Sequence, residues 1–135
     1  MRYSQHRALT ILVLLYAAAS LIHFVHNAEF IRYYPNLPLS WTRGAVYMAW
    51  LGLTAVGACG WWLVSRGYEV AGLLVLVGYA LLGLESLGHY FAAPFSAHTS
   101  AMNVTILLEV IAAALVLVEV VRLIVERVRR SFPVD

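Results

Sequence analysis

The sequence predicts an all-α fold, in which a single domain forms an integral membrane bundle of four antiparallel helices in up-down-up-down order. Three observations support this prediction. Of the 135 residues, 62% are hydrophobic and only 12% are charged, whereas a soluble domain carries about 25% charged residues. The apolar residues form four runs, each near the roughly 20 residues that a helix needs to cross the hydrocarbon core. The connections between the runs are short, which favours antiparallel neighbours.

The four apolar runs, in chain order, cover about residues 8–30, 45–64, 70–91 and 101–124. None of them shows the period-2 alternation of a barrel strand, and lipid tolerates no unpaired backbone, so each is predicted to be a helix. The alanines at 17–19 resemble a signal-peptide cleavage site, but the apolar run continues beyond them, and we expect this helix to be retained. Residues 125–135 are predicted to form a cytoplasmic tail.

Small residues on the second and third runs are expected to let helix backbones approach one another in lipid. These residues are Ala45, Ala49, Gly52, Gly60, Gly72, Gly78, Gly83 and Gly88. The only cysteine, Cys59, excludes a disulfide within the chain.

The distribution of arginine, which supplies all nine basic residues, predicts the orientation. Only Arg32 and Arg43 lie at the end of the bundle that carries the loops 31–43 and 92–99; the other seven lie at the opposite end. By the positive-inside rule, both termini are expected in the cytoplasm and the two loops outside. The predicted location is therefore the cytoplasmic (plasma) membrane, with membrane lipid as the surrounding partner.

Ionisable residues interrupt the apolar runs near their outward ends, although each such residue costs on the order of 2.5–3.5 kcal/mol on insertion. Helical rise places them in two tiers. The outer tier contains His26, His89 and His98, and the inner tier contains His23, Glu85 and Glu109. On each helix these residues are expected to share one face. This pattern predicts an outward-facing pocket of histidine and glutamate side chains between the first, third and fourth helices.

Imidazoles and carboxylates are the standard donors for iron, zinc and divalent copper, and helical bundles build metal sites from facing side chains. The first hypothesis is therefore a bound iron, copper or zinc ion and a metal-dependent oxidoreductase activity. The predicted metal ligands are His23, His26, Glu85, His89 and His98. The predicted catalytic carboxylates are Glu85 and Glu109, as ligands or proton carriers.

Three alternatives without this metal site fit the same residues. Two histidines, His23 or His26 together with His89, are suited to axial ligation of a haem, although carboxylates at the same depth are less expected there. A metal-free accessory subunit of a larger membrane complex uses its polar residues only to hold helices together. Oligomers are compatible with each alternative, and nothing in the sequence indicates binding to nucleic acid.

The third alternative is an enzyme in which buried glutamate and histidine act as general acid and base on a lipophilic substrate. In its four-helix architecture and its lining carboxylates and histidine, the layout resembles the membrane family of sterol isomerases and related lipid-binding receptors. The resemblance implies a lipid-soluble substrate held in a cavity of the bundle.

Overall fold

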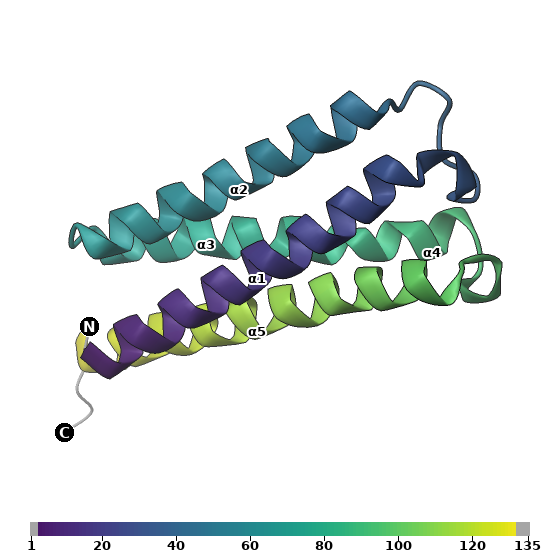
Figure 1. The fold of residues 1–135 in the computed structure, drawn as a ribbon. Helices are drawn as coiled ribbons and strands as arrows, with labels where there is room; N and C mark the ends of the chain where they lie inside the picture. The colour runs from purple at the N-terminus through teal and green to yellow at the C-terminus, as the bar shows by residue number, and fades with distance from the viewer. Residues whose placement is uncertain (1–2, 132–135) are drawn as a thin grey trace.

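The computed structural model describes residues 3–131 and contains four long antiparallel helices (Figure 1). The helices are α1 (Tyr3–Glu29), α2 (Arg43–Ser65), α3 (Glu69–Leu84), the short α4 (Gly88–Ala92) and α5 (Ser100–Ser131). Single 3-10 turns are η1 (Ile31–Tyr33), η2 (Glu85–Leu87) and η3 (Phe95–Ala97). Helix α1 packs against α2 and α5, and α3 packs against the same two helices, so the four long helices form a closed ring around one core.

Four stretches of the described residues are long and apolar enough to cross a membrane, in agreement with the four predicted helices. They are Gln5–Glu29, Arg43–Ser65, Glu69–Ala92 and Ser100–Ser131. Many large apolar side chains face outward, and Leu14, Leu74 and Val118 are each more than half exposed. An exposed apolar surface of this kind is unusual for a soluble monomer and suits a lipid environment.

The two ends of the bundle differ in character. The terminal end carries both chain ends (Figure 1) and the turn at Gly67, whose φ of 89° favours glycine. The distal end carries the loops 30–42 and 93–99. There Glu29 forms an ion pair of 2.6 Å with Arg43 and accepts a hydrogen bond of 2.6 Å from Tyr47. Glu29 thus joins the end of α1 to the start of α2 at the distal surface.

Helix α5 extends beyond the predicted end at 124 and continues to Ser131. Its last turns carry ion pairs at helical spacing, in which Arg122 contacts Glu119 at 2.7 Å and also contacts Glu126. Such pairs three and four residues apart stabilise exposed helical turns. Part of the predicted tail is therefore helical; residues 132–135 lie outside the described residues.

The run 70–91 was predicted as one continuous helix, and the structure divides it instead. Helix α3 ends at Leu84, the 3-10 turn η2 follows, and α4 begins at Gly88. Serine and glycine form helices less readily than the leucines around them, and the tighter turn brings the Ser86 hydroxyl to a side chain of α5. The interruption of the helix thus allows Ser86 to form a hydrogen bond with Glu109 in the interior of the bundle.

Two glycines allow close packing around a pair of tyrosines: Gly83, which was predicted, and Gly57, which was not. The rings of Tyr16 and Tyr79 lie 4.3 Å apart, and the Tyr16 hydroxyl donates to the Tyr79 carbonyl at 3.1 Å. A Cβ atom at Gly83 would lie 2.1 Å from the Tyr16 hydroxyl, and one at Gly57 would lie 2.7 Å from the Tyr79 ring. By contrast, a Cβ would meet nothing at Gly52, Gly78 or Gly88. Glycine is therefore required by space at only some of the predicted positions.

Candidate functional site

Polar side chains from α1, the segment after η1, the α3–α4 interruption and α5 meet in the distal half of the bundle. We call this group the polar cluster. It comprises His23, His26, Asn27, Tyr34, Ser86, His89, His98, Thr105 and Glu109. The sequence placed five of these residues at the predicted site, namely the four histidines and Glu109.

Glu109 is the innermost member and is fully buried on α5. The Ser86 hydroxyl donates to its Oε2 atom at 2.6 Å, and Nε2 of His23 lies 3.7 Å from the same atom. Its other oxygen, Oε1, has no hydrogen-bond partner among the described residues. A carboxyl group at this depth without a fixed cation beside it is unusual, which makes Glu109 a candidate functional residue.

The hydrogen bonds around His23 indicate which ring nitrogen carries its proton. Nδ1 of His23 lies 3.4 Å from the Thr105 hydroxyl oxygen, and this hydroxyl donates its own hydrogen to the Met102 carbonyl at 3.0 Å. Thr105 must therefore accept from His23, which assigns the proton of a neutral ring to Nδ1. Nε2, which lies 3.7 Å from Oε2 of Glu109, is then left as a proton acceptor on the side of the carboxyl group.

His89, on α4, connects the remaining imidazoles. Its ring centroid lies 5.4 Å from that of His23 and 6.2 Å from that of His98. Nδ2 of Asn27 lies 3.3 Å from Nε2 of His89, so this nitrogen is occupied by α1. No described residue forms a hydrogen bond with the other nitrogen, Nδ1, which is the atom of His89 left for a bound molecule.

His98 reaches the polar cluster by a different route from the one predicted. Its backbone is extended, and α5 begins only at Ser100, so His98 and Glu109 do not form a stripe on one helix. His98 is nevertheless 6% exposed, and its Nδ1 contacts the Pro94 carbonyl at 3.1 Å. Nε2 of His98 is buried without a partner in the described part of the chain.

Tyr34 and Ser86 belong to the site and were not predicted. Tyr34 is 4% exposed, and its hydroxyl lies 2.9 Å from Nδ1 of His26. Burial raises the pKa of Tyr34 to about 12, so the phenol is neutral at physiological pH. No periodicity marks Tyr34, because it follows the end of α1, and Ser86 lies in a run that was predicted as an unbroken helix.

A cavity of about 410 Å³ lies beside the polar cluster, between α1, α2 and the α3–α4 interruption. Its polar wall consists of His23, Asn27, Glu85, Ser86 and His89. Its apolar wall consists mainly of Phe24, Leu37, Trp41, Val46, Ala49, Leu53 and Leu82. Glu85 is exposed and lies at this wall, whereas Glu109 lies behind it, in contact with Ser86. The two predicted carboxylates therefore occupy different environments.

Among residues 3–131, no group of three or more His, Cys, Asp or Glu side chains is placed to hold a metal ion. The imidazoles lie close together, but their ring contacts are edge-to-face, with interplanar angles of 78° for His23–His89 and 80° for His89–His98. Cys59 is exposed on α2. The predicted metal site thus receives no support from this arrangement.

Fold and site together define a four-helix bundle with candidate membrane spans and a buried histidine–glutamate pair next to a cavity. Comparison with protein families, with curated proteins and with solved structures finds no match.

Proposed function

We propose that this is an integral membrane protein that binds a lipophilic molecule in the cavity and exchanges a proton with it. The observation that carries the proposal is the position of the cavity. One wall is apolar, the facing wall presents His89 and Ser86, and the buried carboxyl of Glu109 lies directly behind Ser86.

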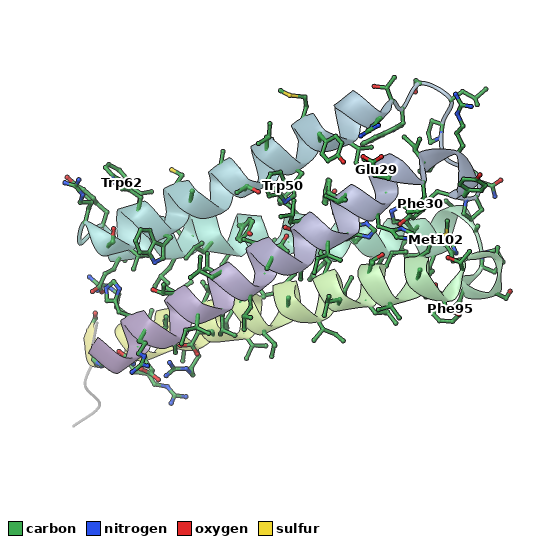
Figure 2. The ribbon with its side chains drawn as sticks, in the orientation of Figure 1. Glu29, Phe30, Trp50, Trp62, Phe95 and Met102 are labelled. Carbon is green, nitrogen blue, oxygen red and sulfur yellow. The ribbon has the colours of Figure 1, made fainter. Side chains whose placement is uncertain are left out.

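The apolar wall and its surroundings favour a ligand that partitions into lipid. Val46, Ala49 and Leu53 place one side of α2 along the cavity. Figure 1 shows that α2 inclines away from α3 toward the distal end. Trp50, labelled in Figure 2, donates from α2 to Ser20 of α1 at 3.3 Å and joins these helices within the stretch of α2 that lines the cavity. We expect a ligand dissolved in the bilayer to enter beside α2, and a mostly apolar pocket with a few polar groups is the usual form of a small-molecule site.

Proton exchange is supported by two groups on the polar wall. Nδ1 of His89 has no hydrogen-bond partner among residues 3–131 and serves as the acceptor or donor that touches the ligand. The Ser86 hydroxyl donates to Glu109 and can accept a hydrogen bond from the ligand at the same time. Glu109 then stores or supplies the proton, and His23 holds Glu109 in place. A histidine and a carboxyl group in such different surroundings suit acid and base roles.

The arginine distribution supports an orientation with the terminal end in the cytoplasm and the distal end, with the cavity, on the outer side. Leu39, in the exposed distal loop, provides the test. In a Cys59→Ala background, a Leu39→Cys variant should react with a membrane-impermeant thiol reagent added outside intact cells. Protection of this cysteine until the cells are lysed would reverse the orientation.

Photo-crosslinking tests the cavity. The full chain in lipid nanodiscs is exposed to a long-chain alcohol carrying a diazirine, and labelled residues are located by mass spectrometry. We expect labels on Leu53 and Leu82, lost in Ala49→Trp, which fills the cavity. The matched control Ala55→Trp, on an exposed position of α2 outside the cavity, should keep them. Labels spread over lipid-facing residues such as Leu14 would contradict the proposal.

A metal ion bound between His89 and His98 is the second candidate, favoured by the buried and unpartnered Nε2 of His98. Metal analysis of the purified protein tests it, and a visible absorption spectrum tests haem. Stoichiometric iron, copper or zinc that disappears in His89→Ala would favour the metal-dependent activity over proton exchange with a lipophilic ligand.

A further inference from the structure

A second pocket, which we call the distal pocket, lies at the distal end of the bundle beside the cavity. It has a volume of about 630 Å³ and is formed by the end of α1, the loop 30–42 and the start of α2. Leu37 and Trp41 line both the distal pocket and the cavity, so the two spaces share a wall.

We propose that the lipophilic molecule is an anionic amphiphile. Its chain occupies the cavity, and its phosphate or carboxylate group binds at Arg32 and Arg43 in the distal pocket. This ligand class rests on the proposed function, because the chain lies in the same cavity and carries the group that exchanges a proton with His89.

The charged side chains that line the distal pocket carry a net positive charge. They are Glu29, Arg32 and Arg43. Glu29 is already paired with Arg43 at 2.6 Å and accepts a hydrogen bond from Tyr47. No carboxylate among residues 3–131 forms an ion pair with Arg32. An anion that enters the distal pocket therefore meets one guanidinium whose charge is not compensated by the protein.

Arg43 adds donors to the distal pocket although it is paired. Its Nη2 atom contacts Glu29, but a guanidinium has five N–H donors in a planar fork that matches phosphate and carboxylate oxygens. Arg43 also begins α2, where the Thr42 hydroxyl accepts from the N–H of Ala45 at 3.2 Å. The other first-turn N–H groups have no partner within the helix and give its start a partial positive charge. The start of α2 thus adds to the attraction of an anion by Arg32.

The loop that carries Arg32 is held in place from two sides. Tyr34 is buried, and its hydroxyl lies 2.9 Å from Nδ1 of His26 on α1. Asn36 donates from Nδ2 to the Ala92 carbonyl, at the end of α4, at 2.9 Å. Its φ of 57° lies in the left-handed region, which asparagine adopts more readily than most residues. The walls of the distal pocket are therefore formed before a ligand binds, as is usual for small-molecule sites.

Exposed apolar and aromatic side chains surround Arg32 on the outer side of the loop. Tyr33 and Leu39 are largely exposed, and Trp41 is nearly half exposed. Tyrosine and tryptophan gather at the boundary between membrane and water, at the level of the lipid headgroups. We therefore expect the distal pocket at this level, where the charged group of an amphiphile lies, with the cavity on the side of its chain.

The cavity itself does not suit an anion. Most of its wall is apolar, and a charge buried there without a partner is costly. The carboxyl groups on its polar side are those of Glu85, at the wall, and Glu109, behind Ser86, and neither attracts a negative charge. The two spaces therefore suit the two parts of one molecule, with the chain in the cavity and the anionic group in the distal pocket.

Two matched photo-crosslinking probes test the ligand class. Both carry the same diazirine chain; one ends in a phosphate and the other in an alcohol. The full chain in nanodiscs of neutral lipid is titrated with each probe, and the concentration for half-maximal labelling of Leu53 and Leu82 is measured. We expect the phosphate probe to label at the lower concentration, with an advantage that decreases in high salt.

Variants of the charged residues change this advantage in opposite directions. Arg32→Gln should raise the half-maximal concentration of the phosphate probe about fivefold and leave that of the alcohol probe unchanged. Glu29→Gln should lower it, because Arg43 loses its partner in the protein. Arg129→Gln is the matched control, since Arg129 is exposed at the terminal end of the bundle; it should have no effect.

The alcohol probe separates the two proposals. Cavity labelling without an advantage for phosphate, or with an advantage that Arg32→Gln and Arg129→Gln reduce equally, refutes only the anionic group in the distal pocket. Displacement of the phosphate probe by excess inorganic phosphate would also overturn it, because the site would then bind a free anion and not an amphiphile. Absence of cavity labels with both probes refutes the proposed function, and the ligand class with it.

Discussion

Nε2 of His23 lies 3.7 Å from Oε2 of Glu109, and this contact joins α1 to α5 in the interior of the distal half. Both side chains are almost completely buried. The pair differs in kind from Glu29 and Arg43, which form an ion pair on the exposed distal surface. In the interior two titratable groups lie beside each other away from water, whereas at the surface two opposite charges are in direct contact and exposed to solvent.

The His23–Glu109 contact should be measurable as a coupling energy. We expect His23→Leu and Glu109→Leu each to destabilise the bundle, because each leaves a buried polar partner. The double variant should lose less than the sum, with a coupling of about 1 kcal/mol. Thermal unfolding in detergent of the four proteins of the cycle measures this quantity. Strictly additive changes would mean that the two side chains do not interact.

Removal of the Ser86 hydroxyl should destabilise the protein more than removal of an exposed serine hydroxyl. Ser86→Ala deprives Glu109 of the hydrogen bond of 2.6 Å, and we expect a loss of about 1–3 kcal/mol because the carboxyl remains buried. Ser65→Ala is the control, since Ser65 is exposed and bonds only to the Trp62 carbonyl of its own helix. If both variants unfold at the same temperature, Ser86 is not an essential partner of Glu109.

On α3, alanine should be tolerated in place of Gly78 but not in place of Gly83. Gly83→Ala places a Cβ 2.1 Å from the Tyr16 hydroxyl, and overpacking of this kind costs about 1–3 kcal/mol. Gly78→Ala meets no atom within 4 Å and should be neutral or slightly stabilising, because alanine favours helix. The difference between the two melting temperatures is the measurement, and its absence would show that Tyr16 moves aside freely.

The Glu29–Arg43 pair should contribute little to stability. Arg43→Gln is expected to cost less than about 1 kcal/mol, and the cost should fall further in high salt, because the pair is exposed. Melting temperatures at two salt concentrations provide the test. A large loss that salt does not reduce would instead assign Arg43 a role in holding α2 beside the cavity.

Much of the site was predictable because helical periodicity carries depth and direction. His23 and Glu109, assigned to one tier on two helices, lie beside each other. His98 does lie beside His89, as predicted, but the predicted helical stripe is wrong, because His98 belongs to an extended segment that precedes α5. Tyr34 and Ser86 escaped prediction because one lies beyond a helix end and the other within a 3-10 turn.

The sequence by itself determined the number of apolar helices and the end of the bundle at which polar residues gather, because hydropathy and spacing are properties of a local segment. Only the tertiary structure decided that Ser86 reaches Glu109, that Tyr34 folds back over His26 and that the imidazoles do not converge on one point. These relationships depend on how far each helix is rotated against its neighbours and where a regular turn gives way. Contacts between segments that are distant in the sequence determine the helix rotations and the position of the irregular turn. The residue pattern of one segment does not contain this information.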